Sequence, residues 1–269
     1  ALSTGGVYAG STNYFFPGEI TQLSDNSAEY LINAPGSPDD TILDIGDRLS
    51  GIFNINSTEG LSSGGLKETT SSGIYDELSG VFDIQVTGKV ADGAGGWDFT
   101  FGAAAEFEAV YGAGAMVAFY TDPDFEYSRL NDTIANLTGN ITDGSLFMVA
   151  GFDGGGNEFW TANAITDDIA LVGAIPPPNE GGGYNAAVDL LVNNTGREFN
   201  AVDCFDPNSI TFTTSDLCGS GSLLGTGNVN TPFDSFDNVD FTMFAVPEPS
   251  MALLLGTGLL AGVGFARRR

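Results

Sequence analysis

Apolar and polar residues alternate along most of this chain, and long windows with the helical spacing of apolar residues are scarce. Alternation of this kind is typical of β-strands that bury one face. Clusters rich in glycine, proline and aspartate separate the alternating segments and predict turns. Strands are expected at Ala28–Ile32, Arg48–Ile55, Glu77–Val90, Trp97–Val110, Met116–Tyr120, Ser145–Gly151, Ala186–Val192, Ile210–Thr213 and Val239–Val246.

One segment departs from this pattern. Between Asp124 and Leu137, the apolar residues Leu130, Ile134 and Leu137 follow helical spacing, which predicts a short helix that covers one end of the fold. The predicted fold of residues 1–245 is therefore all-β. We expect an antiparallel β-sandwich of the jelly-roll type with this one helix.

A short internal echo links two of the predicted strands. Arg48–Ile55 reads RLSGIFNI and Glu77–Ile84 reads ELSGVFDI, so Leu, Ser, Gly, Phe and Ile recur at the same spacing. Two copies are too few for a solenoid. The echo predicts neighbouring strands that use equivalent glycines to bend and equivalent phenylalanines to fill the core.

Composition and charge narrow the class of protein. The chain has 269 residues with 38 Gly and 11 Pro, and it suits one domain with many turns. Of its eight basic residues, three are the terminal arginines, so the remainder carries five basic residues against 35 acidic ones. Nucleic acid is excluded as a partner because phosphate binding needs clustered Lys or Arg. A high negative charge is typical of a soluble extracellular protein.

The chain contains no histidine, which removes most catalytic chemistry. Ser-His-Asp and Cys-His nucleophiles and the usual His-containing zinc and iron sites cannot be built. Paired carboxylates could still cleave glycosides, but 35 acidic residues place some pair at that distance by chance. We therefore expect a protein that is not an enzyme. If it binds sugars, exposed aromatic residues such as Trp97, Trp160 and Tyr184 are the candidate contacts.

Two further features of the domain carry chemistry. Cys204 and Cys218 lie 14 positions apart in a polar segment and are expected to form a disulfide, since an exported protein meets an oxidising compartment. No cofactor is expected except calcium. Asp122, Asp124 and Glu126 alternate as the first ligands of a calcium loop do, although the glycine and distal glutamate of such a loop are missing. The second acidic cluster contains Asp39, Asp40, Asp44 and Asp47, and a solvated loop is the alternative for both clusters.

The C-terminal segment predicts a membrane anchor. Met251–Ala266 contains no charged residue, and the 18 residues from Pro249 would span about 27 Å as a helix, close to the roughly 30 Å of a bilayer core. Arg267, Arg268 and Arg269 are expected on the cytoplasmic side, which places the acidic domain outside. At the other end, Ala1-Leu2-Ser3-Thr4 is typical of a chain from which a signal peptide has been removed.

The tail as a whole resembles the PEP-CTERM sorting signal of Gram-negative bacteria that produce extracellular polysaccharide. Val246-Pro247-Glu248-Pro249, a short apolar span and an arginine cluster carry the resemblance over residues 246–269. It implies that Pro247, Glu248 and Pro249 are recognised by an exosortase, which cuts near the motif and passes the protein to the cell surface or matrix. The resemblance says nothing about the task of residues 1–245.

The leading functional hypothesis is a non-catalytic surface or matrix protein that contributes to biofilm or exopolysaccharide structure. Its expected partners are the exosortase, matrix polysaccharide, the membrane before processing, and further copies of itself. Self-assembly into filaments by edge-strand addition is one variant, with Ala1–Phe16 as the extended segment. The alternative is a surface module that binds carbohydrate or calcium.

Overall fold

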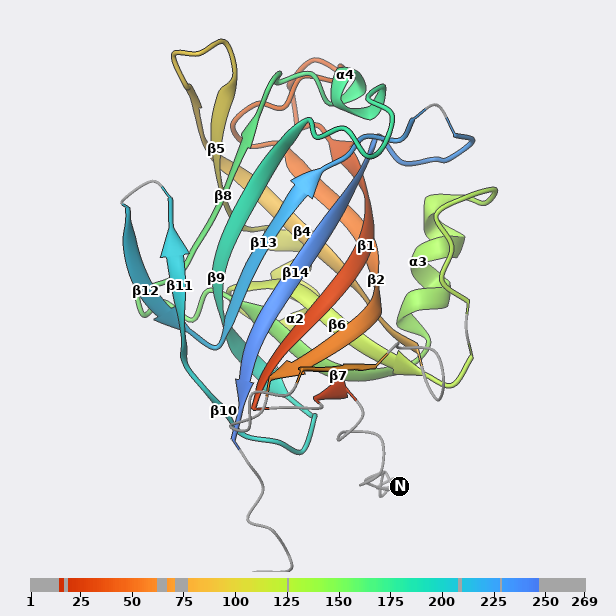
Figure 1. Cartoon of the computed structure of the whole chain (residues 1–269). Helices are drawn as coiled ribbons and strands as arrows, with labels where there is room; N and C mark the ends of the chain where they lie inside the picture. The colour runs from red at the N-terminus through yellow and green to blue at the C-terminus, as the bar shows by residue number, and fades with distance from the viewer. Residues whose placement is uncertain are drawn as a thin grey trace, which may run out of the picture.

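The computed structural model describes residues 15–16, 19–61, 67–70, 77–124, 126–207, 210–227 and 229–246. Strands dominate this part of the chain, as predicted (Figure 1). The helices are α2 (Ala105–Tyr111), α3 (Ile134–Thr142) and α4 (Ile169–Gly173). The strands are β1 (Ile20–Ile32), β2 (Arg48–Leu61), β3 (Lys67–Thr70), β4 (Glu77–Ala91), β5 (Trp97–Ala103), β6 (Ala115–Asp122), β7 (Ser145–Gly151), β8 (Phe159–Ala164), β9 (Gly182–Asn193), β10 (Phe199–Asn200), β11 (Val202–Asp206), β12 (Thr211–Ser215), β13 (Leu217–Leu223) and β14 (Ser235–Ala245).

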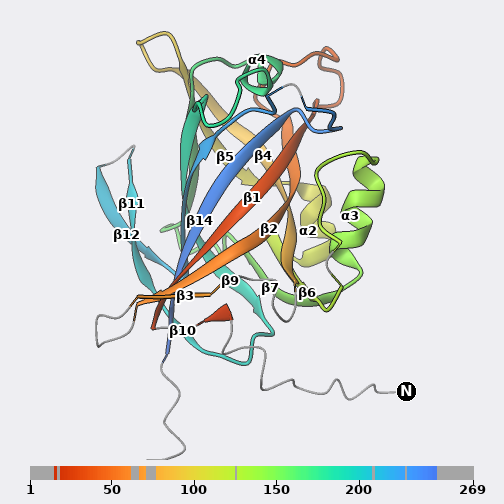
Figure 2. The ribbon, with the colours of Figure 1, turned by 45° about the vertical axis from the view of Figure 1, so that its right-hand side comes forward.

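Eight of the strands form one antiparallel sheet that closes on itself. Around the ring, neighbouring strands follow the order β2, β1, β14, β13, β9, β8, β5 and β4, and β4 pairs with β2 again. Two long strands change neighbour along one edge: β4 pairs first with β6 and then with β5, and β9 pairs first with β8 and then with β7. Figures 1 and 2 show the strands running obliquely around the common interior.

The predicted two-layer sandwich is therefore wrong, although its all-β class and antiparallel pairing are confirmed. Alternating residues give each strand one buried face in a sandwich and in a closed sheet alike, so alternation does not distinguish them. Long, bent strands allow this sheet to close on itself. Irregularities between Ser24 and Asp25 in β1, and between Val86 and Gly88 in β4, bend two of them.

The internal echo corresponds to a reciprocal contact between β2 and β4. The strands are antiparallel neighbours, with Gly51 opposite Phe82 and Phe53 opposite Gly80. A Cβ on Gly51 would lie 2.6 Å from Cζ of Phe82, and one on Gly80 would lie 2.3 Å from Cζ of Phe53. The prediction of neighbouring strands is confirmed, but each glycine makes room for the phenylalanine of the other strand.

Two predicted elements differ from the structure. The strand expected at Trp97–Val110 ends at Ala103, and α2 follows, because Phe107 and Tyr111 pack together as helical neighbours with ring centroids 4.4 Å apart. The helix expected within Asp124–Leu137 begins only at Ile134, where Thr133 Oγ1 accepts the Asn136 N–H. This helix, α3, lies against the outer face of the sheet and does not cover its end (Figure 2).

Apolar side chains fill both sides of the closed sheet. The interior holds a large cluster that includes Leu23, Phe53, Phe119 and Met243. A second cluster, with Ile52, Leu137 and Ile141 among its members, lies between the sheet's outer face and the helices α2 and α3.

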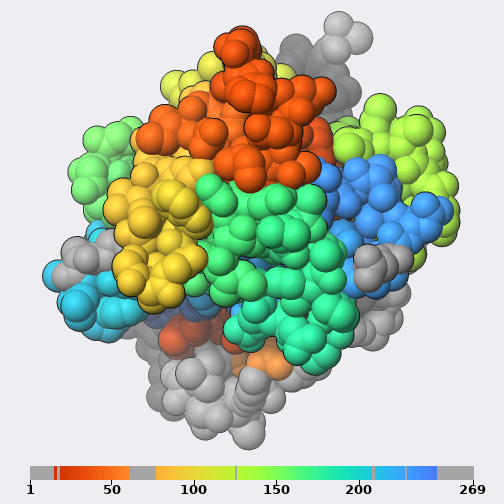
Figure 3. All heavy atoms as spheres, turned by 90° about the horizontal axis from the view of Figure 1, so that it is seen from above, coloured from red at the N-terminus to blue at the C-terminus, as the bar shows by residue number. Residues whose placement is uncertain are grey.

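The two ends of the interior are covered differently. At the end near β7 and β10, Phe15 and Phe16 are buried and their rings pack on Phe147, while Phe16 also packs on Phe199. At the opposite end lie α4 and the loops seen from above in Figure 3. Side chains of the surrounding strands therefore line the interior, and aromatic rings close it at one end.

A disulfide attaches a two-stranded hairpin to the closed sheet. Cys204 on β11 and Cys218 on β13 are bonded, with their Cα atoms 5.2 Å apart, which confirms the predicted pair. The hairpin of β11 and β12 stands away from the main sheet (Figure 1) and exposes Phe205 and Phe212, whose rings lie 5.5 Å apart.

Candidate functional site

The predicted calcium ligands occupy the end of β6 and the loop after it. Asp122 Oδ1 accepts the backbone N–H of Asp124 at 2.7 Å, and both Asp124 and Glu126 are exposed. Their carboxylates are not among the groups of three acidic side chains whose ligand atoms converge within 4.8 Å in the described part of the chain. Asp122 therefore stabilises a turn at this position.

The other acidic cluster also serves a turn. Asp47 is buried and accepts the backbone N–H groups of Ala34 and Asp44 at 2.8 and 2.7 Å. Asp44 in turn pairs with Lys89 at 2.7 Å. Asp47 therefore stabilises this turn from a buried position, which differs from the solvated loop stated as the alternative.

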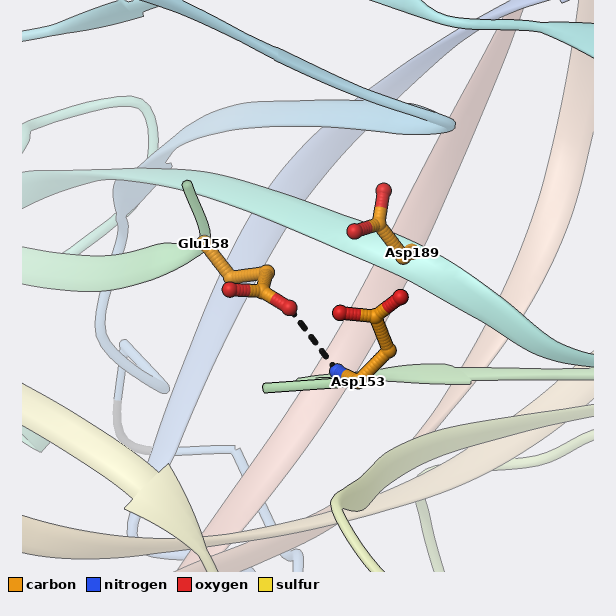
Figure 4. Close-up of side chains that lie close together, drawn as sticks. All are labelled: Asp153, Glu158 and Asp189. Atoms are coloured by element: carbon orange, nitrogen blue, oxygen red, sulfur yellow. Dashed lines mark hydrogen bonds between the residues drawn. The ribbon is translucent and has the colours of Figure 1, made fainter. Parts of the chain in front are cut away.

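Three other carboxylates do converge, at Asp153, Glu158 and Asp189 (Figure 4). Their ligand atoms lie within 4.8 Å of one another. Asp153 and Glu158 belong to the glycine-rich loop between β7 and β8, and Asp189 projects from β9 toward them. The sequence predicts only a turn in this glycine-rich loop, because Asp189 is distant from it along the chain.

Backbone N–H groups hold Glu158 in place. Its Oε1 accepts from Asp153, Gly154 and Gly155 at 2.9, 3.0 and 3.1 Å, and its Oε2 accepts from Gly156 at 2.8 Å. Burial acts to raise the pKa of Glu158, but hydrogen bonds from Asp153 and the loop outweigh it and lower this pKa to about 2. Gly154 and Gly156 have φ angles of +90° and +78°, which explains glycine at both positions.

The surroundings of Asp189 stabilise its anion less than those of Glu158 stabilise the Glu158 anion. Burial raises its pKa, the N–H of Asp216 opposes this, and the charges of Asp216, Asp153 and Glu158 raise it further. Concentrated negative charge and oxygen ligands suit a hard cation such as Ca²⁺. Three carboxylates supply only part of the six to eight oxygens that Ca²⁺ takes, so backbone carbonyls or water would complete the shell.

A second acidic group lies inside the closed sheet. Asp25 and Glu29 on β1 and Asp237 on the neighbouring β14 have 1%, 3% and 3% of their surface exposed. They line a cavity of about 60 Å³ together with mostly apolar side chains. Burial raises the pKa of all three carboxyls, and the charge of Asp237 raises those of Asp25 and Glu29 further.

The interior carboxyls are only partly satisfied by the protein. Asp25 accepts hydrogen bonds from the Val239 N–H and the Ser27 hydroxyl. Glu29 Oε2, Asp237 Oδ1 and the Tyr184 hydroxyl are buried and make no hydrogen bond of regular geometry, although Asp237 interacts with both Glu29 and Tyr184. The sequence did not predict this cluster, although Asp237 shares its alternating face with Val239 and Phe241.

Two aromatic residues expected at the surface belong to this interior. Trp160 and Tyr184 have only 6% and 4% of their surface exposed, and their rings stack with centroids 6.3 Å apart. They are therefore not exposed sugar contacts, because β8 and β9 turn these positions inward. Trp97 is half-buried, with Lys89 Nζ 4.7 Å from its ring centroid.

The predicted sorting residues Pro247, Glu248 and Pro249, the apolar span and Arg267, Arg268 and Arg269 lie outside the described residues. Within the described part of the chain, no helix has the length and apolar character needed to cross a membrane.

Comparison with known proteins identifies one segment. Residues 245–269 match the family described as the PEP-CTERM protein-sorting motif, which confirms the resemblance drawn from the sequence. No curated protein matches the chain. The motif supports export, processing by an exosortase and sorting to the cell surface, and it covers the tail alone.

Proposed function

We propose that this chain, which carries the PEP-CTERM motif, is a non-catalytic protein of the cell surface or extracellular matrix that contributes to biofilm or exopolysaccharide structure. The motif at residues 245–269 carries the proposal, because it directs a protein to the place where such a matrix is built. The charge of the domain agrees with it. Six acidic residues of the described part are buried, and the others lie at least partly at the surface, where they keep an extracellular protein soluble.

A deletion strain tests the proposal. We expect cells without the protein to form a matrix of lower mass or cohesion, and the full-length chain to restore it. A variant with Pro247, Glu248 and Pro249 replaced by alanine should not restore it, although its domain is unchanged. Matrix of equal mass and cohesion in all of these strains would contradict the proposal.

Self-assembly into filaments is a finer form of the same proposal. Within the described residues, β12 is an end strand that pairs only with β11, although the Asn157 side chain donates to its Thr214 carbonyl, so another strand would have to displace this contact. Phe15 and Phe16 pack inside their own chain, so the extended segment would have to act through the residues before them. Negative-stain microscopy of purified mature protein should then show filaments, and uniformly dispersed single particles would exclude this form.

Calcium binding is the second candidate, and the convergence of Asp153, Glu158 and Asp189 favours it. In that case millimolar Ca²⁺ should raise the thermal midpoint by several degrees, because a ligand that binds only the folded state stabilises it. Asp189→Asn should abolish the shift, whereas Asp124→Asn, in the originally predicted cluster, should leave it intact. A midpoint that does not change with Ca²⁺ would exclude this candidate.

A further inference from the structure

The cavity inside the closed sheet has the chemistry of a binding site, and nothing in the sorting motif accounts for it. Its free space of about 60 Å³ could hold a few water molecules or a small molecule with a few non-hydrogen atoms. Most of its surface is apolar and comes from residues such as Phe53, Phe82 and Trp160, and the carboxyl groups of Asp25, Glu29 and Asp237 are gathered on one side, here called the acidic wall. An interior kept only for stability would be filled with apolar side chains.

The acidic wall has unused hydrogen-bonding capacity. Glu29 Oε2, Asp237 Oδ1 and the Tyr184 hydroxyl each lack a hydrogen bond of regular geometry, although Asp237 interacts with both Glu29 and Tyr184, and their residues are at least 96% buried. A buried polar atom without a partner costs free energy that is recovered when a donor arrives. The wall therefore has more hydrogen-bond acceptors than donors, and no basic residue is among the described residues that line it.

The position of Tyr184 shows how the sheet makes this wall. On β13, Gly221 lies opposite Tyr184 of β9 on one side and opposite Val239 of β14 on the other. A Cβ on Gly221 would lie 2.7 Å from the Tyr184 hydroxyl and 2.0 Å from the carbonyl oxygen of Asn238. Glycine thus leaves space for the phenol beside β13, where it extends the acidic wall formed by β1 and β14.

No Lys or Arg is among the residues that line the cavity in the described part of the chain. Two basic groups lie outside it: Lys89 pairs with the lining residue Asp167, and Arg129 packs over the ring of Phe236, with Cζ 4.2 Å from its centroid, and donates to the carbonyl of Ser27 at 3.2 Å. Phe236 belongs to the cluster on the outer face of the sheet. The protein therefore places no cation of its own in the cavity.

A metal ion fits this wall less well than an organic cation. Asp25, Glu29 and Asp237 are all described, yet they are not a group whose ligand atoms lie within 4.8 Å of one another. An ammonium group bonds oxygens that lie further apart, and its carbon atoms pack on rings whose faces attract positive charge. A neutral sugar or alcohol would leave the carboxylates uncompensated.

Access is expected at the end of the sheet where α4 lies. Thr166, Asp167, Ile169 and Val172 line the outer part of the cavity there, and Asp167 pairs with Lys89 at 2.8 Å. Figure 3 shows this end, with the loops packed around α4. The opposite end is closed by Phe15, Phe16 and Phe147.

We propose that the interior of the closed sheet binds a small organic ammonium ion, held by Asp25, Glu29 and Asp237 and packed against Trp160 and Tyr184. This binding is a second property of the domain, independent of its place in the matrix. Its chemistry selects for positive charge and a short carbon chain.

Propylammonium and propan-1-ol form a matched pair of probes, because they have the same size and differ in charge. We expect propylammonium at neutral pH to raise the thermal midpoint and to change the fluorescence of Trp160, and propan-1-ol to do neither. Calorimetry should show affinity reduced at least tenfold in Glu29→Gln/Asp237→Asn. Asp98→Asn, on the exposed face of β5, should bind as the wild type does.

Tyr184→Phe removes one hydroxyl and provides a milder test, with an expected loss of a few fold. The amide variants remove buried charge and keep side-chain size, so their folding can be verified by their thermal midpoints. Equal responses to the two probes would overturn the proposal, as would unchanged affinity in the double variant. Stabilisation by Ca²⁺ that disappears in this double variant but persists in Asp189→Asn would also overturn it and assign the cavity to a metal.

Discussion

Replacing Gly80 with alanine is expected to destabilise the protein by about 3 kcal/mol, near the upper end for overpacking in a core. The new methyl group would lie 2.3 Å from Cζ of Phe53 and 2.4 Å from the carbonyl oxygen of Ala118 on β6. The ring fills the interior and the carbonyl belongs to the neighbouring strand, so neither can move cheaply. Urea unfolding measures the change.

Gly139 provides the control, because a Cβ there has no other atom within 4 Å. It lies on α3, where alanine is a better helix former by up to about 1 kcal/mol, so Gly139→Ala should be neutral or stabilising. Adding Phe53→Leu to Gly80→Ala should recover part of the loss, since the contact with Ala118 remains. Equal stability of Gly80→Ala and Gly139→Ala would contradict the reciprocal packing of β2 and β4.

The thermal midpoint is expected to fall by about 5 °C or more between pH 5 and pH 8. Asp25, Glu29 and Asp237 have folded-state pKa values raised by burial above the ordinary 3.8 for Asp and 4.5 for Glu. Their contribution to stability is fully present below the ordinary values and is lost as pH rises through the folded ones. Glu158, whose pKa is lowered to about 2, stays ionised throughout this window. Calorimetric melting at several pH values measures the slope.

Asp237→Asn should raise the midpoint at pH 8 and flatten this slope, because it removes one buried carboxyl and keeps its shape. Asp98→Asn removes the same formal charge from the exposed face of β5, so it controls for repulsion among the many surface carboxylates. A midpoint that is constant or rises from pH 5 to pH 8 would contradict the account of the interior. So would equal slopes in the two variants.

The local character of the strands followed from sequence, and their closure into one sheet did not. Alternation located segments such as β7, which was predicted with the bounds that the structure gives it. It missed β13, whose LCGSGSL sequence looks like a loop. There the glycines allow close approach of neighbours: Gly219 faces Phe241 and Gly221 faces Tyr184. Because β13 pairs with both β9 and β14, the closed sheet could not be predicted without this strand.

The site residues were predictable only where the signal was local. The disulfide could be predicted because Cys204 and Cys218 are the two cysteines of a chain expected to be exported. The sorting tail could be predicted because its motif is contiguous in sequence. Asp189 meets Asp153 and Glu158 only because β9 runs beside the end of the β7–β8 loop. Asp25 and Asp237 lie more than 200 positions apart in sequence and meet through the pairing of β1 with β14. An acidic residue on an apolar alternating face was the signal that could have found them.

The mass of the mature protein, recovered from the extracellular material of its native cells, tests the central claim most directly. The account predicts a chain that ends at or near Pro247, Glu248 and Pro249 and lacks the apolar span and Arg267–Arg269. In cells without the exosortase, the uncut chain should remain in the membrane fraction. Extracellular protein that still carries the three terminal arginines would contradict sorting by an exosortase.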